Sequence, residues 1–217
     1  MPIRWLILLA ALTISPGRAD DFGSWHALSF RYLHSTHWDL TAFAQLRYHD
    51  DSSELFAYYL SQQVSYKVSP YLKLGMNYTY LPTKPIAGDE FVDQYRWETE
   101  IIPRWPINER LTLDLRNRLE LRWFADQDGV NKRSRHRPQA IIRVIGMAPL
   151  ESLSINNEFF YDYDIGEYNE NRLIPLGLNF RLHPEVNFSL YYMLVSVRPD
   201  ADWFHTHTLG TQLSLHF

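Results

Sequence analysis

The stretch over residues 109–124 alternates between apolar and polar side chains. One set is Leu111, Leu113, Leu115, Asn117, Leu119, Leu121 and Trp123, and the other is Arg110, Thr112, Asp114, Arg116, Arg118, Glu120 and Arg122. At 3.6 residues per turn the leucines would scatter around a helix, whereas a strand places alternate side chains on opposite faces. The stretch also exceeds the usual strand length of about 3–10 residues. The pattern therefore predicts a membrane-barrel strand with lipid outside and a polar lumen.

Alternation with a period of two residues recurs along the rest of the chain. Within the ten strands that it predicts, the apolar face carries no charged side chain. The predicted spanning strands are 38–48, 56–68, 71–81, 95–105, 109–124, 137–147, 153–163, 172–182, 186–194 and 207–217. We predict an all-β, antiparallel transmembrane barrel of about ten strands, within a range of about 10–12, because an even number is the rule in bacterial barrels. The weaker segment 24–33 is then a short extra pairing or a plug. Pro175 lies inside a strand and predicts a bulge there.

The amino terminus reads as a secretory signal over residues 1–19. Arg4 precedes an apolar run, and Gly17 and Ala19 suit cleavage before Asp20. The run is too short for a membrane helix, which needs about 20 residues. Residues 20–217 are expected to form one domain. With a formal net charge of −4 the chain is not expected to bind nucleic acid.

The connections alternate in length and thereby predict an orientation. Longer ones at 49–54, 82–93, 125–134, 164–167 and 199–204 are expected outside the cell, and shorter ones at 69–70, 106–108, 148–149 and 183–185 in the periplasm. Aromatic girdles at the two boundaries are predicted from Tyr58, Tyr66, Tyr78, Tyr80, Trp97, Trp105, Trp123, Tyr161, Tyr163 and Phe217. The terminal Phe217 resembles the signal that the barrel-assembly machinery recognises.

The predicted inner face is rich in charge, and its arginines outnumber its carboxylates. The expected lumen residues are Arg47, Arg96, Glu98, Glu100, Arg104, Arg110, Asp114, Arg116, Arg118, Glu120, Arg122, Arg137, Arg143, Glu158, Arg172 and Arg181. Such a set is compatible with an anion-favouring passage. It is also compatible with a salt-bridge network that plugs a narrow barrel, and a small bore favours the plug.

Catalytic and metal signals are weak. A lipid hydrolase would need a nucleophile and a base together at the outer rim, where the sequence offers His49, Ser52 and Ser53, and His205, Thr206 and His207. No third orienting residue is evident in the sequence. His205 and His207 share a strand face, but two ligands do not make a zinc site. We therefore predict no catalytic site, no metal and no cofactor.

Several motifs carry a family resemblance. They are Y-R-W-E-T-E at 95–100, P-R-W at 103–105, L-R-N-R-L-E-L-R-W at 115–123, R-H-R-P-Q at 135–139, N-N-E-F-F at 156–160 and N-R-L-I-P-L-G-L at 171–178. Together they resemble a family of bacterial outer-membrane proteins known as domain of unknown function 2490. The resemblance implies an outer-membrane barrel and brings no activity or site residues.

These observations predict a monomer in the outer membrane, surrounded by phospholipid and lipopolysaccharide. Its expected role is a narrow or gated, porin-like channel or a structural barrel of the Gram-negative envelope. The alternative is a lipid-modifying enzyme of the lipid A deacylase or phospholipase type.

Overall fold

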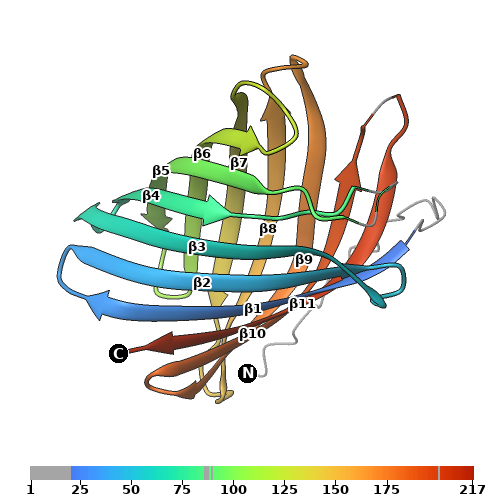
Figure 1. The fold of residues 1–217 in the computed structure, drawn as a ribbon. Coiled ribbons are helices and arrows are strands. Elements are labelled where there is room, and N and C mark those ends of the chain that lie inside the picture. The colour runs from blue at the N-terminus through green and yellow to red at the C-terminus, as the bar shows by residue number, and fades with distance from the viewer. Residues whose placement is uncertain (1–20, 86–87, 89, 200) are drawn as a thin grey trace.

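The computed structural model describes residues 21–85, 88, 90–199 and 201–217, and these residues form a closed barrel of eleven strands (Figure 1). The predicted signal at 1–19 lies outside the described residues. The strands are β1 (Asp21–His34), β2 (Trp38–His49), β3 (Glu54–Ser69), β4 (Leu72–Tyr80), β5 (Gln94–Pro106), β6 (Leu111–Phe124), β7 (Asn131–Arg143), β8 (Leu150–Asp162), β9 (Glu167–His183), β10 (Val186–Val197) and β11 (Phe204–His216). The all-β barrel is thus confirmed. The described residues contain no helix that could span a membrane.

The barrel closes through a parallel pair, β1 with β11, whereas all other neighbours are antiparallel (Figure 1). Asp21 lies opposite Thr206, and Arg31 lies opposite His216. The prediction of ten strands was wrong, because the segment assigned as an extra pairing or plug is the full strand β1. In a ten-strand ring, β1 would keep an unpaired edge of backbone donors and acceptors, which the parallel pair removes.

Several strands begin earlier than predicted, and two of them begin at least five residues earlier. β7 starts at Asn131 rather than at residue 137, and β9 starts at Glu167 rather than at residue 172. The basic run at 132–137 was assigned partly to a loop, but its alternate arginines face carboxylates inside the barrel and extend the strand. Most connections alternate in length as predicted, and the longest, at 81–93, joins β4 to β5. The prediction was wrong for the connection between β7 and β8, which runs over 144–149 and is longer than the one at 163–166 that follows β8.

The predicted bulge at Pro175 is confirmed on both sides of β9. Toward β10 the register passes from Leu176 to Leu173 while β10 advances only from Tyr192 to Leu194. Toward β8 the register shifts across the same part of β9. Because proline has no backbone N–H, the extra residue accommodates a position that cannot donate to the ladder.

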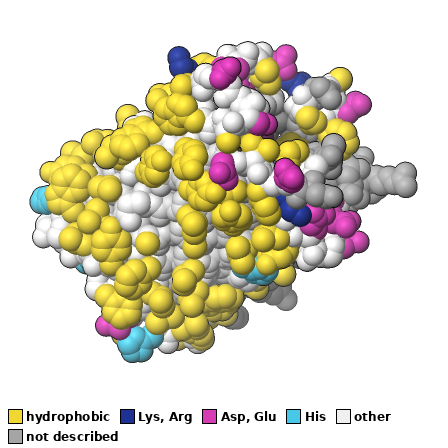
Figure 2. Space-filling view, in the orientation of Figure 1, with side chains coloured by type: hydrophobic (Ala, Val, Ile, Leu, Met, Phe, Trp, Pro, Cys, Tyr) yellow, Lys and Arg dark blue, Asp and Glu magenta, His cyan; other side chains and the backbone are white. Residues whose placement is uncertain are grey.

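The outer surface is mainly apolar between its two ends. Figure 2 shows hydrophobic side chains across the middle of one face, while most of the Asp and Glu side chains gather toward one end. Hydrogen-bonded polar pairs interrupt this surface. Among them, Asn117 Oδ1 lies 2.9 Å from His136 Nδ1, and Asn171 donates to Asn157 at 2.7 Å. Such pairing lowers the cost of placing polar groups in apolar surroundings.

The parallel closure predicts a disulfide that a ten-strand barrel would not form. Leu28 and Leu213 are register partners across β1 and β11, and the chain has no cysteine of its own. Paired positions in a sheet fall within the Cα separation of about 4.4–6.8 Å that a disulfide needs. We expect the doubly substituted L28C/L213C protein to cross-link when oxidised, seen as faster migration on a non-reducing gel after unfolding.

The matched control is L28C/L209C, because Leu209 pairs with Ser24 and lies four residues from the register partner of Leu28. It should not cross-link within one molecule. A cross-link in the control but not in L28C/L213C would contradict the closure.

Candidate functional site: the ionic network of the lumen

The most distinctive site is a network of ion pairs inside the barrel, built by β5, β6, β7 and β8. Register places Glu98 opposite Glu120, Glu100 opposite Arg118, and Glu120 opposite Arg133. Because inward positions repeat every second residue, the acidic positions of β5 and the mixed positions of β6 face the basic positions of β7. The alternation that defines the strands thus also assembles the network.

Glu120 lies at the centre of the network and is fully buried. Arg133 Nε donates to Glu120 Oε2 at 2.8 Å, and Arg135 Nη1 donates to Glu120 Oε1 at 2.7 Å. Arg96 and Arg118 lie 3.8 Å from the same carboxylate. A buried carboxylate held by four guanidinium groups is compensated for the hydration it loses.

Glu98 is also fully buried and lies beside Arg118. Arg118 Nη1 lies 2.9 Å from Glu98 Oε2, and Arg118 Nη2 lies 2.5 Å from Glu100 Oε1. Asn77 donates to Glu98 at 3.2 Å, and the Tyr59 hydroxyl donates at 3.4 Å. One arginine therefore links two carboxylates of β5, and side chains from β3 and β4 complete the contacts.

Glu158 and Phe160 extend the network onto β8. Arg135 donates to both Glu158 oxygens at 3.0 and 2.9 Å, and Arg116 approaches the same carboxylate at 2.5 Å. Phe160 has no exposed surface, and its ring lies 4.6–4.8 Å from the guanidinium carbons of Arg133, Arg135 and Arg172. The ring attracts these cations and spaces them apart.

The structure separates the predicted lumen residues into groups. The buried ion-pair network contains Arg96, Glu98, Glu100, Arg116, Arg118, Glu120, Arg122, Glu158 and Arg172. Arg47 and Arg137 line the lumen but form no ion pair within the described residues. Arg104 with Asp114, and Arg181 with Glu151, form pairs near the end that carries the short turns.

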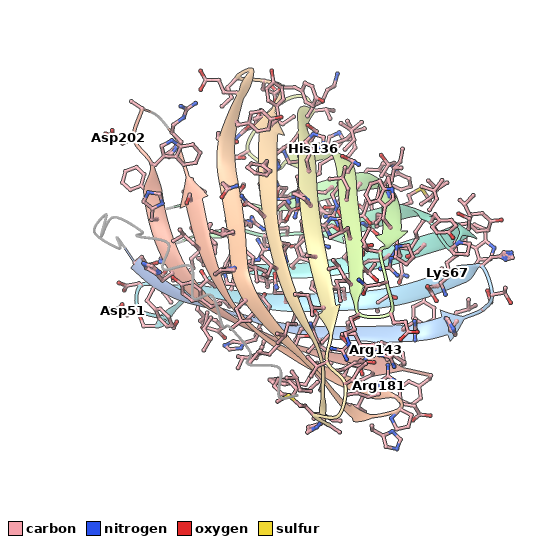
Figure 3. The ribbon with its side chains drawn as sticks, turned by 180° about the vertical axis from the view of Figure 1, so that it is seen from behind. Asp51, Lys67, His136, Arg143, Arg181 and Asp202 are labelled. Atoms are coloured by element: carbon pink, nitrogen blue, oxygen red, sulfur yellow. The ribbon has the colours of Figure 1, made fainter. Side chains whose placement is uncertain are left out.

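Two predicted lumen residues lie elsewhere. Arg110 is in the turn between β5 and β6, because the Asn108 side chain accepts from the backbone N–H groups of Arg110 and Leu111 at 2.9 Å and sets the start of β6. Arg143 is the last residue of β7 and is exposed (Figure 3). Neither belongs to the ionic network.

Sequence reasoning missed four members of the network: Arg133, Arg135, Asp162 and Glu170. Arg133 pairs with Glu170 at 3.0 Å, and Arg122 pairs with Asp162 at 2.7 Å. Each missed residue continues the inward parity of a predicted one, since Arg133 and Arg135 precede Arg137 in steps of two. Extending the alternation through the basic run would have found Arg133 and Arg135. Asp162 and Glu170 would have followed from the parity of Glu158 and Arg172.

The predicted girdle residues face outward, and several stack between neighbouring strands. Tyr80 contacts Tyr58 and Tyr95, with ring centroids 6.0 and 5.2 Å away, and Tyr161 contacts Tyr163 at 5.1 Å. Tyr66 packs on Trp38 at the opposite end of the barrel, and Tyr78 packs on Trp97. Trp105, Trp123 and Phe217 are exposed.

The catalytic candidates of the first long connection do not meet a base. Ser53 Oγ donates to the backbone oxygen of Asp50, and His49 stacks on Phe56. A different serine does meet a histidine: Ser196 Oγ lies 2.9 Å from His205 Nδ1 across β10 and β11. His207 instead contacts the Tyr192 hydroxyl. The described residues hold no group of three or more His, Cys, Asp or Glu arranged for a metal.

Comparison with known proteins places this barrel in a family. The model of a family described as protein of unknown function (DUF2490) matches residues 22–206. The chain belongs to the DUF2490 family. The match runs from β1 into β11 and includes the whole ionic network. No curated protein matches the chain, and neither does any solved structure.

Loss of the central carboxylate should destabilise the barrel strongly. In Glu120→Gln the amide keeps the volume but leaves Arg133 and Arg135 without their shared charge. Breaking a buried ion pair from one side costs about 3–5 kcal/mol. We expect a loss of that size in the free energy of unfolding, measured by denaturant titration of the folded protein.

Glu109→Gln is the matched control, because Glu109 is exposed in the turn before β6. Its effect should be close to zero. Equal losses in the two variants would show that the network does not hold the barrel together.

Proposed function

We propose that this protein spans the bacterial outer membrane as a structural barrel whose lumen the ionic network closes to ions. The proposal takes its compartment from the signal expected at residues 1–19 and from the distribution of polarity between the two faces of the wall. It favours the plug over the anion-favouring passage.

One observation carries the membrane part: the wall is apolar outside and ionic inside. Leu60, Ile101, Leu119 and Leu176 come from four strands and are 48, 54, 44 and 47 % exposed, whereas Glu98 and Glu120 are fully buried. A water-soluble barrel would have the opposite arrangement, because large exposed apolar surfaces are unfavourable in water and buried charges are costly. Hydrocarbon around the barrel reverses the first of these penalties.

Direct contacts between the charged side chains inside the barrel support a closed lumen. The guanidinium groups of Arg135 and Arg133 lie 2.7 and 2.8 Å from the carboxylate oxygens of Glu120. An ion that crosses the barrel at this level would have to displace them. Thr79, Glu98 and Phe160 fill the same region without exposed surface. Rings of charge conduct when water separates them, but here direct contacts replace the water.

A charge on the outer wall distinguishes a membrane barrel from a soluble one. Leu119→Arg places a cation at a position that is 44 % exposed in the middle of β6. In water this change should cost little, but facing lipid it costs about 2–4 kcal/mol. We expect L119R to fold into phospholipid vesicles in much lower yield than the parent, measured as the fraction that resists unfolding on an unheated gel.

Val130→Arg is the control, because Val130 is similarly exposed but lies in the connection before β7. Its yield should match the parent. Equal yields of all three proteins would exclude a lipid-facing wall.

The same vesicles test the closed lumen. Vesicles that contain the parent protein should retain trapped chloride and potassium as well as empty vesicles do. Rapid, anion-selective leakage would overturn the closed barrel in favour of the channel.

The contact between Ser196 and His205 supports a second candidate function, hydrolysis of acyl esters at the membrane surface. Both side chains project to the outside of the wall near the longer connections, and Ser196 is 8 % exposed. Asn171 occupies the register position next to Ser196 on β9. A serine within hydrogen-bond distance of a histidine is the minimal arrangement for nucleophilic catalysis.

The step would begin with attack of Ser196 Oγ on the ester carbonyl while His205 accepts the hydroxyl proton. The ester C–O bond then breaks, His205 returns the proton to the leaving alcohol, and water hydrolyses the acyl-serine to a fatty acid and free serine. The ring orientation decides which nitrogen performs this role.

Fatty-acid release from phospholipid and lipopolysaccharide vesicles tests the second candidate. The parent should release fatty acid, and Ser196→Ala should reduce the rate by at least about a thousandfold. Ser53→Ala, which removes a rim serine without a histidine contact, should not change it. No release by the parent, or equal release by S196A, would eliminate the hydrolase.

A further inference from the structure

Next to the ionic network the lumen contains a cavity of about 330 Å³ with a strongly unbalanced lining. Six arginines line it, Arg47, Arg116, Arg118, Arg135, Arg137 and Arg172, and the only carboxylate among the described lining residues is Glu158. Amide side chains, including Gln45, and the aromatic ring of Trp25 complete the wall. A chamber with this charge attracts anions.

Four of the six arginines are neutralised by direct contact with carboxylates. Arg118 meets Glu98 and Glu100, Arg116 and Arg135 meet Glu158, and Arg172 meets Glu170. These arginines form part of the cavity wall, but their positive charge is compensated by the carboxylates. The uncompensated positive charge of the cavity lining therefore lies on Arg47 and Arg137.

Arg47 is held in place without a carboxylate. Its Nε donates to Gln45 Oε1 at 2.8 Å, and its guanidinium lies 4.1 Å from the ring centroid of Trp25 and 5.4 Å from that of Tyr59. Arg172 approaches the same Trp25 ring at 4.8 Å. Rings and an amide orient a guanidinium but do not neutralise it, so its terminal N–H groups keep their capacity to bind an anion.

Arg137 has no hydrogen bond or ion pair within the part of the chain that the structure describes, and its Nε is buried there without a partner. Arg137 is half-buried, and a cation that is partly withdrawn from water without a partner is costly unless a counter-ion accompanies it. A second cavity of about 450 Å³ lies next to the first, and Arg116 and Arg137 line both of them. Arg137 therefore stands between the two chambers.

The second cavity offers a route from the end that carries the short turns. Its charged lining comprises Lys67, Lys73, Arg104, Arg116 and Arg137 against Asp39 and Asp114. A surplus of cations along a concave passage draws anions inward. Asp51 and Asp202 lie at the opposite end, beside the longer connections, where they disfavour anion entry (Figure 3).

We propose that the lumen holds a binding site for a small oxyanion, phosphate or sulfate in character, between Arg47 and Arg137, entered from the short-turn end. Guanidinium groups bind such oxygens through charge-assisted hydrogen bonds. The site goes beyond the closed structural barrel and does not depend on membrane insertion, since it can be measured in detergent.

Titration calorimetry of the folded protein with inorganic phosphate tests the site, with ionic strength held constant by chloride. The parent should bind about one phosphate, and sulfate should compete. Arg47→Gln and Arg137→Gln should each weaken binding by about tenfold or more. Arg198→Gln is the control, because Arg198 pairs with Glu167 at the far rim, and should leave the affinity unchanged. Absence of phosphate binding by the parent would overturn the site.

Thermal unfolding separates binding from a purely structural role. Phosphate should raise the unfolding midpoint of the parent in a saturable way, because a ligand that binds only the folded state stabilises it. In chloride alone, R137Q should unfold no earlier than the parent, since it removes an unpaired cation. The proposal would be contradicted if R137Q unfolded at a lower temperature than the parent in chloride and phosphate raised the unfolding midpoint of R137Q as much as that of the parent.

Discussion

The interaction on which the structure depends is the burial of Glu98, Glu120 and Glu158 among arginines. Both carboxylates with no exposed surface, Glu98 and Glu120, lie inside the barrel and are shielded from bulk water. The loss of hydration is offset only if each oxygen meets a guanidinium at short range, and the cross-strand register provides those contacts. The network therefore fixes register as well as lumen packing, because a slip of one residue would send the carboxylates to the outer face.

The parallel closure shows how the two ends of the chain complete the ring. β1 and β11 both start at the end with the longer connections, so they can pair only in the parallel sense. Eleven pairings from Asp21 with Thr206 to Arg31 with His216 leave little of either edge open. The hydrogen-bonded wall is therefore continuous, but it has an odd number of strands, whereas bacterial barrels usually have an even number.

Alternation in the sequence predicted the barrel, most strand positions and the bulge at Pro175, because period two is a local property. It could not predict that β1 closes the ring, since a pairing between residues near 21 and near 206 is set by the whole circumference. In the lumen, parity placed Glu120 and Arg118 on the same inner face, and the structure buries both in the ionic network. Parity alone did not show that Arg110 falls in a turn, because that depends on the contact made by the Asn108 side chain.

The filled part of the lumen and the cavity beside it have one origin. β5–β8 carry long charged side chains that meet in the middle, whereas inward positions of β1 and β11 include Ser29, Thr208 and Gly210. At Gly210 a Cβ would lie only 2.0 Å from the Tyr191 ring, so the ring can lie across β11 only because that position is glycine. The carboxylates are concentrated in the filled part and neutralise the arginines there. Arg47 and Arg137 face the remaining space, so the same arrangement that closes the barrel leaves an uncompensated positive charge beside the cavity.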